Sequence, residues 1–235
     1  MNVAVIFAGG FGSRMKNTGA PKQFMPFRGK PILIHTLDHF QNHPEIDAIS
    51  LAILPEWLDD AREMIAHFGI SKMRWIVGGG KTGQLSIYNA LKAIESPNAE
   101  NTNVLMHDGV RPLIDADLIS RIIAQADRTG TAVTTYPTQE TSVVSDDGSI
   151  ICDVLDRPKT FIAQAPQAFR LSTILDCHER AIAEGKFDFI DSCSLFRAYE
   201  KDPVCMVEGL KCNIKITTPE DYHTLQVLYD TKEDK

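Results

Sequence analysis

The first 137 residues alternate between short apolar runs and amphipathic stretches. Runs rich in β-branched residues predict buried strands, at Val3–Ala8, Ala48–Leu54, Met73–Val77, Val104–Met106 and Ala132–Tyr136. Apolar residues at helical spacing predict helices between them, at Pro31–Phe40, Leu58–Phe68, Leu85–Ile94 and from the capping residue Asp115 to about Asp127. This alternation predicts an α/β fold with parallel strands and with helices on both faces of the sheet.

The order of elements changes after Pro137. Two short apolar segments, Ser142–Val144 and Ser149–Ile151, flank Asp146-Asp147-Gly148, which predicts a hairpin. A hairpin inserted into an α/β sheet tends to project from it. We therefore expect an arm at about residues 138–160 that contacts another subunit.

Two further elements are predicted near the C-terminus. Lys215 alternates with Ile214 and Ile216, which indicates a strand on which Lys215 points away from the core. Thr217-Thr218-Pro219-Glu220 has a threonine cap, a proline and an acid in the order typical of a helix start. We expect residues 1–235 to form a single domain that carries the arm.

Composition narrows the class of protein. Hydrophobic residues make up 43% of the 235 residues and charged residues 23%, as in an ordinary globular protein. The net charge is −7, from 24 Lys+Arg and 31 Asp+Glu, which argues against a nucleic-acid partner. No apolar run approaches the roughly 20 residues that cross a bilayer, and the N-terminus lacks the pattern of a secretory signal. The five cysteines form no C-x-x-C pair, so we expect reduced thiols in a cytoplasmic protein without a membrane partner.

Polar and glycine-rich loops follow three of the predicted strands. They are Gly9–Lys22, Gly78–Ser86 and His107–Pro112. In parallel α/β sheets, ligands bind beyond the carboxyl ends of the strands. These loops are therefore the candidate functional site.

Neither of the first two loops matches the nucleotide-binding motif that it resembles, a dinucleotide-binding fingerprint for the first and a Walker loop, at Gly80-Lys81-Thr82, for the second. A dinucleotide-binding fingerprint requires a third glycine where this chain has Met15, and a Walker loop requires a glycine where it has Trp75. The glycines Gly9, Gly10 and Gly12 are instead followed by basic residues without an acid among them, namely Arg14, Lys16, Lys22, Arg28 and Lys30. Glycine N–H groups and cations bind phosphate oxygens, which favours a polyphosphate ligand. A tight turn and a solvated basic loop are the alternatives.

The segment Ala8-Gly9-Gly10-Phe11-Gly12-Ser13-Arg14-Met15, with Pro21-Lys22-Gln23 after it, resembles the opening signature of the IspD/TarI cytidylyltransferases. That family comprises 2-C-methyl-D-erythritol 4-phosphate and ribitol 5-phosphate cytidylyltransferases. The resemblance continues in family order to about residue 222, through Gly79-Gly80 with Ser86, His107-Asp108 with Arg111-Pro112, Asp156-Arg157, Ala165-Pro166-Gln167, Asp191, and Asn213-Ile214-Lys215-Ile216-Thr217.

The resemblance implies a Rossmann-like three-layer sandwich with a mostly parallel central sheet, a β-hairpin arm that forms a homodimer, and Mg²⁺-dependent transfer of CMP from CTP to a sugar-alcohol phosphate. By matching motif, the backbone at Ala8, Gly9, Gly10 and Gly12 would hold the nucleotide. Arg14 and Lys22 would hold its triphosphate. The cytosine would lie against Gly79, Gly80 and Ser86.

The resemblance also implies the acceptor side of the site. Asp108 lies where the family has an acid near the acceptor and the metal. Arg111, Thr141 and Arg157 match positions that hold the acceptor phosphate, the last two reaching across the dimer. Lys215 matches a lysine that contacts the reacting phosphates.

This chemistry agrees with the kinds of residue in the loops. In such a transfer the acceptor phosphate is itself the nucleophile, so the protein supplies cations, backbone N–H groups and Mg²⁺ rather than a nucleophilic side chain. Magnesium prefers few carboxylates together with phosphate oxygens, which a lone Asp108 would satisfy.

Three positions depart from the methylerythritol branch of the family. Gly83 stands where that branch usually has arginine, and Ala165 and Ile190 stand where it has threonine. The departures resemble the ribitol 5-phosphate branch, so we expect D-ribitol 5-phosphate as the acceptor and CDP-ribitol, a wall-teichoic-acid or capsule precursor, as the product. The methylerythritol reaction of isoprenoid synthesis is the alternative, and a sensor that binds CTP without turnover is a rival of another class.

Several residues have plainer interpretations. His35, His39 and His43 follow helical spacing, and solvated histidines are favoured over a metal site. The adjacent Cys177 and His178 cannot face the same way on a helix, which disfavours a catalytic dyad. A hydrogen bond that orients the loop is favoured for His107, and a surface salt bridge stays open for Arg157.

Overall fold

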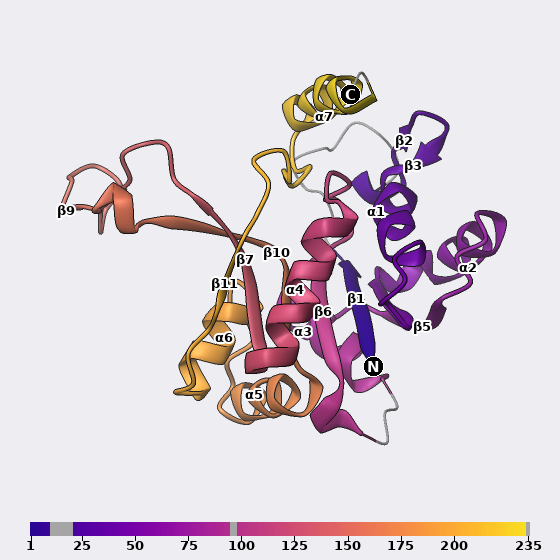
Figure 1. Ribbon diagram of the computed structural model, residues 1–235, viewed down its shortest axis with the longest axis horizontal. Helices are drawn as coiled ribbons and strands as arrows, with labels where there is room; N and C mark the ends of the chain where they lie inside the picture. The colour runs from indigo at the N-terminus through magenta and orange to yellow at the C-terminus, as the bar shows by residue number, and fades with distance from the viewer. Residues whose placement is uncertain (10–20, 95–97, 234–235) are drawn as a thin grey trace.

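The computed structural model describes residues 1–9, 21–94 and 98–233. Its centre is a sheet of seven strands in the order β11-β7-β10-β6-β1-β4-β5 (Figure 1). The strands are β1 (Asn2–Ala8), β4 (Ala48–Ile53), β5 (Met73–Gly78), β6 (Asn103–Asp108), β7 (Thr131–Pro137), β10 (Phe161–Arg170) and β11 (Met206–Glu208). The predicted strands of the first 137 residues are thereby confirmed.

Helices cover both faces of this sheet. They are α1 (Ile32–Gln41), α2 (Leu58–His67), α3 (Gly83–Lys92), α4 (Ala116–Thr129), α5 (Leu171–Ala183), α6 (Ser192–Tyr199) and α7 (Pro219–Glu233). Asp115 caps α4 as predicted, because its Oδ1 accepts the N–H of Leu118 at 2.8 Å. Helix α3 begins two residues before the predicted start, with Thr82 as its cap.

The core lies in two layers, one on each side of the sheet. Ala4 and Ile6 of β1 pack with α1, α2 and α4, whereas Val3 and Val5 pack with α3, α5 and α6. All four side chains are fully buried. A strand covered on both faces reads as a continuous apolar run, which is why the sequence predicted it. The expected three-layer α/β architecture is confirmed.

Strand β10 distinguishes this sheet from a fully parallel one. It lies between β6 and β7 and is antiparallel to both, whereas β1 is parallel to β4 and β6. Its register against β7 shifts between Ala163 and Gln167. Residues 164–166 therefore stand opposite the single residue Thr134, which makes a bulge at this point of β10.

The predicted hairpin exists with a different pairing. Val143–Val144 (β8) pairs with Asp153–Val154 (β9), not with Ser149–Ile151. The reason is the Asp147 carboxylate, whose Oδ1 accepts the N–H of Ser149 at 2.8 Å and of Ile150 at 2.9 Å. These donors are therefore engaged within the turn. The hairpin extends well away from the sheet in Figure 1.

The C-terminal helix α7 is present as predicted, with Pro219 as its first residue. It packs on the hairpin formed by β2 (Pro26–Phe27) and β3 (Lys30–Pro31) through Leu225, Tyr222 and Tyr229. The predicted strand at Lys215 is wrong, since residues 211–217 form no strand. Among the described residues, the N–H of Ile216 is the one backbone donor of this segment that bonds a distant segment, at the carbonyl of Val110, and one such bond is too few for a ladder.

No helix in the described ranges is long and apolar enough to cross a membrane.

Candidate active site

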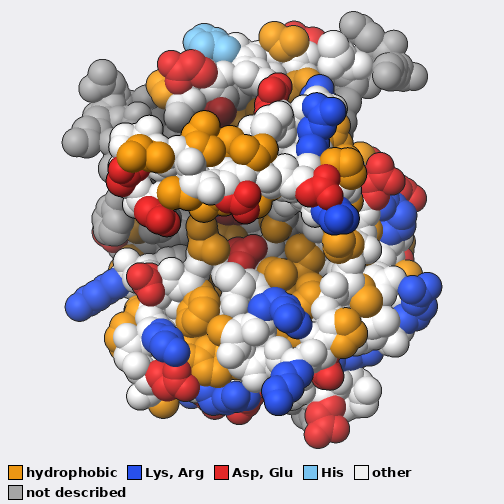
Figure 2. Space-filling view, turned by 90° about the vertical axis from the view of Figure 1, so that its left-hand side faces the viewer, with side chains coloured by type: hydrophobic (Ala, Val, Ile, Leu, Met, Phe, Trp, Pro, Cys, Tyr) orange, Lys and Arg blue, Asp and Glu red, His pale blue; other side chains and the backbone are white. Residues whose placement is uncertain are grey.

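Two adjoining pockets lie beyond the carboxyl ends of β1, β5 and β6, where the sequence predicts a site. The larger has a volume of about 450 Å³ and the smaller about 320 Å³. Four of the described residues line both, namely Phe7, Gly83, Asp108 and Lys215. Figure 2 shows that the face bearing the arm is hollowed near its middle. The shared residues mark the junction at which ligands in the two pockets would meet.

The smaller pocket holds most of the described residues predicted to bind the nucleotide. It is lined by Ala8, Gly9, Lys22, Gly80 and Ser86, among others. Gly10, Gly12 and Arg14 lie outside the described residues. Their roles, like those of the residues on the pocket wall, stay predictions.

Lys22 is placed on this wall by its neighbour Gln23. The Gln23 side chain is 1% exposed, and its Nε2 donates to the carbonyl of Ala8 at 2.6 Å. This bond joins the short 3-10 turn Lys22–Phe24 to the end of β1. Sequence reasoning gave Gln23 no role, although it stands in the quoted motif.

The glycines at the ends of β1 and β5 allow a close approach to α3. A Cβ on Gly9 would lie 2.9 Å from Ser86 Oγ, and one on Gly79 would lie 3.0 Å from it. Ser86 Oγ in turn accepts the N–H of Gly80 at 3.0 Å and donates to the carbonyl of Thr82 at 2.9 Å. Ser86 thus shapes the loop by its own hydrogen bonds, and any larger side chain at Gly9 or Gly79 would collide with it.

Asp108 at the junction is paired with two cations. Its Oδ2 accepts Arg111 Nε at 2.7 Å, and its Oδ1 lies 2.6 Å from Lys215 Nζ. Burial by itself would raise the pKa of the Asp108 carboxyl, but Lys215 and Arg111 outweigh that effect and hold the pKa below its usual value. The carboxylate is therefore ionised and fixes both cations beside the reaction space. The structure brings these three predicted residues together.

Arg111 is oriented by a second contact. Its Nη1 donates to the carbonyl of Asn213 at 2.8 Å, and Asn213 Nδ2 donates to the carbonyl of Ala165 at 2.6 Å. Asn213 is fully buried. The segment around Lys215 is thereby tied to the bulge of β10.

The larger pocket contains the three positions that depart from the methylerythritol branch, namely Gly83, Ala165 and Ile190. Its wall at residues 186–193 is held by two buried glutamines that sequence reasoning missed. Gln84 donates to the carbonyl of Lys186 at 3.0 Å and accepts the N–H of Phe189 at 2.9 Å. A polar residue inside an otherwise apolar helical stripe was the available signal.

Gln167 holds the other end of the same wall. Its Nε2 donates to Asp191 Oδ2 at 2.9 Å, and its Oε1 accepts the N–H of Cys193 at 2.9 Å. Asp191 Oδ1 also accepts the N–H of Ser194 at 2.8 Å and so caps α6. These bonds place the Asp191 carboxylate on the pocket wall.

Thr141 and Arg157 lie elsewhere. Both are exposed on the arm, and neither lines either pocket. The prediction that they act on the site of a second subunit stays a prediction.

His35 and His39 lie on α1 and His43 follows its end, and two of the three, His35 and His43, are buried rather than solvated. His35 is 9% exposed and His43 2% exposed. His35 Nε2 lies 2.7 Å from the carbonyl of Phe27, His39 Nε2 2.9 Å from that of Pro112, and His43 Nε2 3.1 Å from that of Ala116. The three rings therefore tie α1 and the residue segment after it to β2, to Pro112 and to the start of α4.

His107 makes the predicted loop contact. Its Nε2 lies 3.1 Å from the carbonyl of Arg111, and burial lowers its pKa to about 3. The imidazole is therefore neutral and suited to hold the loop. The thiol of Cys177, next to His178 in the sequence, is not an activated nucleophile, since burial raises its pKa to about 12.

The donor set at the junction fits magnesium. Within the described ranges no three His, Cys, Asp or Glu side chains are grouped as a metal cluster, and Asp108 is the carboxylate shared by both pockets. Mg²⁺ is commonly held by one or two carboxylates together with substrate phosphates and water. Asp108 with phosphate oxygens from a bound nucleotide would supply such a set.

Comparison with known proteins adds to this geometry. The sequence model of the family described as 2-C-methyl-D-erythritol 4-phosphate cytidylyltransferase (IspD) matches residues 2–230. A Streptococcus agalactiae protein named ribitol-5-phosphate cytidylyltransferase is 45% identical over 235 residues, 100% of this chain and 98% of the relative. A Clostridium botulinum protein named 2-C-methyl-D-erythritol 4-phosphate cytidylyltransferase is 39% identical over 220 residues, 94% of this chain and 93% of the relative.

A solved structure shares the fold. The 4-diphosphocytidyl-2C-methyl-D-erythritol synthase from Anaerococcus prevotii superposes with a TM-score of 0.84 and 30% identity. The match covers 97% of this chain and 96% of that one.

Proposed function

Because the chain belongs to the IspD family of cytidylyltransferases, we propose that it transfers CMP from CTP to D-ribitol 5-phosphate, with CDP-ribitol and pyrophosphate as products. The observation that carries the reaction type is the Asp108–Arg111–Lys215 cluster at the junction of two pockets. The choice of ribitol rests on the 45% identity, over the whole chain, to a relative named for that substrate, against 39% for one named for methylerythritol phosphate.

The two substrates occupy the two pockets in this proposal. CTP lies in the smaller pocket, with its triphosphate at Lys22 and at the glycine loop that includes the predicted residues Gly10, Gly12 and Arg14. Ribitol 5-phosphate lies in the larger pocket, with its phosphate at Arg111. Lys215 lines both pockets and is placed to contact phosphates from either side.

The reaction is an in-line displacement at phosphorus. An oxygen of the acceptor phosphate forms a bond to the α-phosphorus of CTP, the bond to the oxygen that bridges to the β-phosphate breaks, and pyrophosphate leaves. Two anions must approach each other, so the cations of Lys22, Arg111 and Lys215 lower the barrier by offsetting their charge. The Asp108 carboxylate keeps Arg111 and Lys215 in place without reorganisation during the reaction.

Magnesium completes the proposed site at Asp108. When bound there it would neutralise charge on the triphosphate. Since Asp108 already bonds two cations, we expect the metal to bind together with CTP, whose phosphate oxygens supply the remaining ligands.

The active form in this proposal is a homodimer formed through the arm. Apolar side chains of the arm are exposed in the single chain, with Ile150 65%, Ile151 61% and Val154 55% exposed. An apolar patch of this kind is typical of a protein interface. Thr141 and Arg157 of one subunit then reach the acceptor phosphate bound to the other.

The place of action in this proposal is the cytoplasm, where the product would feed wall-teichoic-acid or capsule synthesis. The five cysteines are unpaired with each other, as expected in a reducing compartment.

Pyrophosphate release with CTP and Mg²⁺ tests the proposal, with ribitol 5-phosphate and methylerythritol 4-phosphate measured side by side. A large kcat/KM ratio in favour of ribitol is expected. A ratio in favour of methylerythritol would identify an isoprenoid enzyme. CTP binding without pyrophosphate release from either acceptor would identify a sensor.

A further inference from the structure

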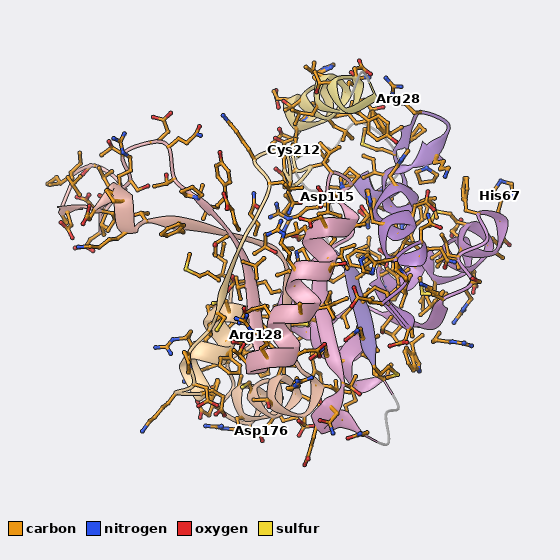
Figure 3. All side chains as sticks on the ribbon, in the orientation of Figure 1. Arg28, His67, Asp115, Arg128, Asp176 and Cys212 are labelled. Atoms are coloured by element: carbon orange, nitrogen blue, oxygen red, sulfur yellow. The ribbon has the colours of Figure 1, made fainter. Side chains whose placement is uncertain are left out.

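The larger pocket has an apolar inner end that the proposed reaction has not used. Its lining includes the buried apolar side chains of Ile87, Met106 and Leu195, together with His178, which is 1% exposed. His178 comes from α5, the helix that carries the labelled Asp176 in Figure 3. Asp108, Arg111 and Lys215 line the same pocket at its junction with the smaller one.

His178 is a buried polar side chain without a hydrogen-bond partner among the described residues. It is 1% exposed, and neither Nδ1 nor Nε2 makes a hydrogen bond. Its described ring contact is with Tyr88, at 6.0 Å between ring centres. By contrast, the amides of Gln84 and Gln167 on the same pocket are fully engaged with the wall. Oε1 of Gln164, which lines the same pocket, is also buried and unpaired, but Nε2 of that amide donates to the carbonyl of Leu210. Among the described lining residues, His178 is thus the one whose side-chain polar atoms are all buried and unpaired.

An unpaired buried polar group is costly. Such a group destabilises a folded protein relative to a paired one, and an apolar side chain of similar size would avoid that cost. Proteins keep unpaired buried polar groups mainly at functional sites, because a bound ligand supplies the missing hydrogen-bond partner.

The protonation state of His178 narrows the kind of ligand. Burial lowers its pKa to about 4, so the ring is neutral near pH 7. A neutral imidazole has one nitrogen that donates and one that accepts. A hydroxyl group also donates and accepts, whereas a phosphate or an ammonium group would require a charged partner in this apolar surrounding.

The direction of the acceptor follows from the reaction. Its phosphate must lie at the junction to reach the α-phosphorus of CTP. Its carbon chain therefore points away from the smaller pocket and into the larger one, past apolar side chains such as Phe7 and Met106. The hydroxyl farthest from the phosphate reaches the inner end.

We propose that His178 binds the terminal hydroxyl of the polyol phosphate and so selects acceptors by the length of their carbon chain. This assignment rests on the proposed function. A five-carbon polyol reaches the imidazole, whereas a four-carbon polyol with its phosphate in the same place stops short and leaves the ring unpaired. His178 is in this sense a specificity-determining residue for the acceptor and has no part in binding CTP.

Access to the ring requires a small adjustment of the wall. Both nitrogens are shielded from solvent in the ligand-free protein. The neighbouring wall is held at Phe189 by Gln84 and at Asp191 by Gln167, while the side chain of Ile190 between them is 93% exposed. Ile190 is therefore the part of the wall with the fewest packing contacts to lose when the polyol enters.

The test compares His178→Leu, which removes both polar atoms, with His178→Gln, which keeps one donor and one acceptor. Cys177→Ala is the matched control, because Cys177 is the adjacent residue of α5, is fully buried and lines neither pocket. For each variant we would measure the melting temperature, KM for CTP, and kcat/KM for ribitol 5-phosphate and methylerythritol 4-phosphate.

Loss of a ligand contact predicts an unusual combination of results. His178→Leu is expected to keep or raise the melting temperature, since it removes an unpaired buried polar group, while KM for ribitol 5-phosphate rises roughly tenfold or more. The ratio of kcat/KM for ribitol over methylerythritol falls by the same factor, and KM for CTP is unchanged. His178→Gln restores part of the ratio, and Cys177→Ala leaves the ratio at its wild-type value.

Other outcomes would overturn the assignment. If His178→Leu lowers the melting temperature and leaves the ratio unchanged, His178 is a structural residue. If the wild-type protein forms no CDP-polyol from either acceptor, the proposed function fails and the assignment falls with it. If the wild type is active but His178→Leu has the same ratio of kcat/KM for ribitol over methylerythritol as the wild type, the assignment of His178 fails and the proposed function stands.

Discussion

The two pockets and the arm differ in whether their side chains find partners within the chain. At the pockets, the carboxylates are paired within the chain: Asp108 with Arg111 and Lys215, and Asp191 with Gln167. On the arm, paired strands are only two residues long and apolar side chains face solvent, as at Ile150 and Ile151. The pockets are therefore organised by one chain, whereas the arm presents a surface that a second chain would complete.

Removal of the Lys22 side chain is expected to have the largest effect on the function of the pockets. Lys22→Ala is expected to lower kcat by about 100- to 1000-fold, because a cation that offsets charge in the transition state is lost. The fold is expected to persist, as Gln23 still joins the turn to β1. Steady-state kinetics and a thermal melt measure both effects.

Lys92→Ala serves as the control for Lys22→Ala. Lys92 is an exposed cation that pairs with Glu179 and lines neither pocket. A near-normal rate in Lys22→Ala, or an equal loss in Lys92→Ala, would remove Lys22 from the mechanism.

A charge on the arm tests the other side of the comparison. Val154→Asp is expected to weaken dimerisation by roughly 100-fold, because the interface would have to desolvate an unpaired carboxylate. Sedimentation at several protein concentrations measures the change. Val227→Asp on α7 is the matched control, since Val227 is 63% exposed and Val154 55%. A Val154→Asp protein as dimeric as the control would show that the arm is not the interface.

Arg157→Ala asks whether the arm contributes to the acceptor site. Loss of a cation from a phosphate contact is expected to raise KM for the acceptor about tenfold, with KM for CTP unchanged. Initial rates with each substrate varied in turn separate the two constants. An effect confined to CTP would contradict the assignment.

Mixed dimers then show on which subunit Arg157 acts. Lys22→Ala and Arg157→Ala proteins, mixed and allowed to exchange subunits, would form hybrids in which one site has an intact Lys22 and an intact Arg157 from the other chain. Since half of the dimers are hybrids with one such site of two, about a quarter of the sites would regain activity. If the mixture regains no activity, Arg157 acts at the site of its own subunit or at neither site.

The smallest expected effect is a pH dependence of stability from the buried histidines. Burial lowers the pKa of His107 to about 3 and of His178 to about 4, below the value of 6.5 for a free histidine. Unfolding therefore takes up protons, so their contribution is present above about pH 6.5 and is lost as the pH falls toward 4. Each histidine is expected to lower the free energy of unfolding by about 2 kcal/mol at pH 5.

Denaturation at pH 7 and pH 5 measures this loss. His178→Leu is expected to lose about half as much free energy of unfolding between pH 7 and pH 5 as the wild type. His67→Ala, a change at an exposed position of α2 (Figure 3), is expected to lose as much as the wild type. An unaltered pH dependence in His178→Leu would mean that His178 is not buried as a neutral ring.

The first half of the fold was predictable because its signals are local. Val3–Ala8 is apolar on both faces and ends in glycines, so it reads as a buried strand with a loop behind it. Asp115 is followed by helical periodicity and caps α4 as expected. Beyond Pro137 the sequence signals were weaker. Strand β10 contains Pro166 and a bulge, which interrupt the alternation by which strands are detected.

The sequence predicted which residues belong to the candidate site but not the contacts that they make with one another. Asp108, Arg111 and Lys215 were all expected near the reacting phosphates, yet the strand expected at Lys215 is absent and the residue reaches Asp108 from an irregular segment. Gln23, Gln84 and Gln167 were not singled out, because a glutamine acquires its role only from the backbone groups that folding places beside it.

The sequence by itself determined the alternating elements, the α/β class, the glycine loops and the basic residues behind them, because periodicity and turn chemistry act over a few neighbours. Only the tertiary structure decided that β10 runs antiparallel between β6 and β7, that Asp108 holds two cations, and that His178 is buried without a partner. These features depend on groups distant in the chain, and the free energy of a buried polar atom is set by which of them lies within hydrogen-bonding distance.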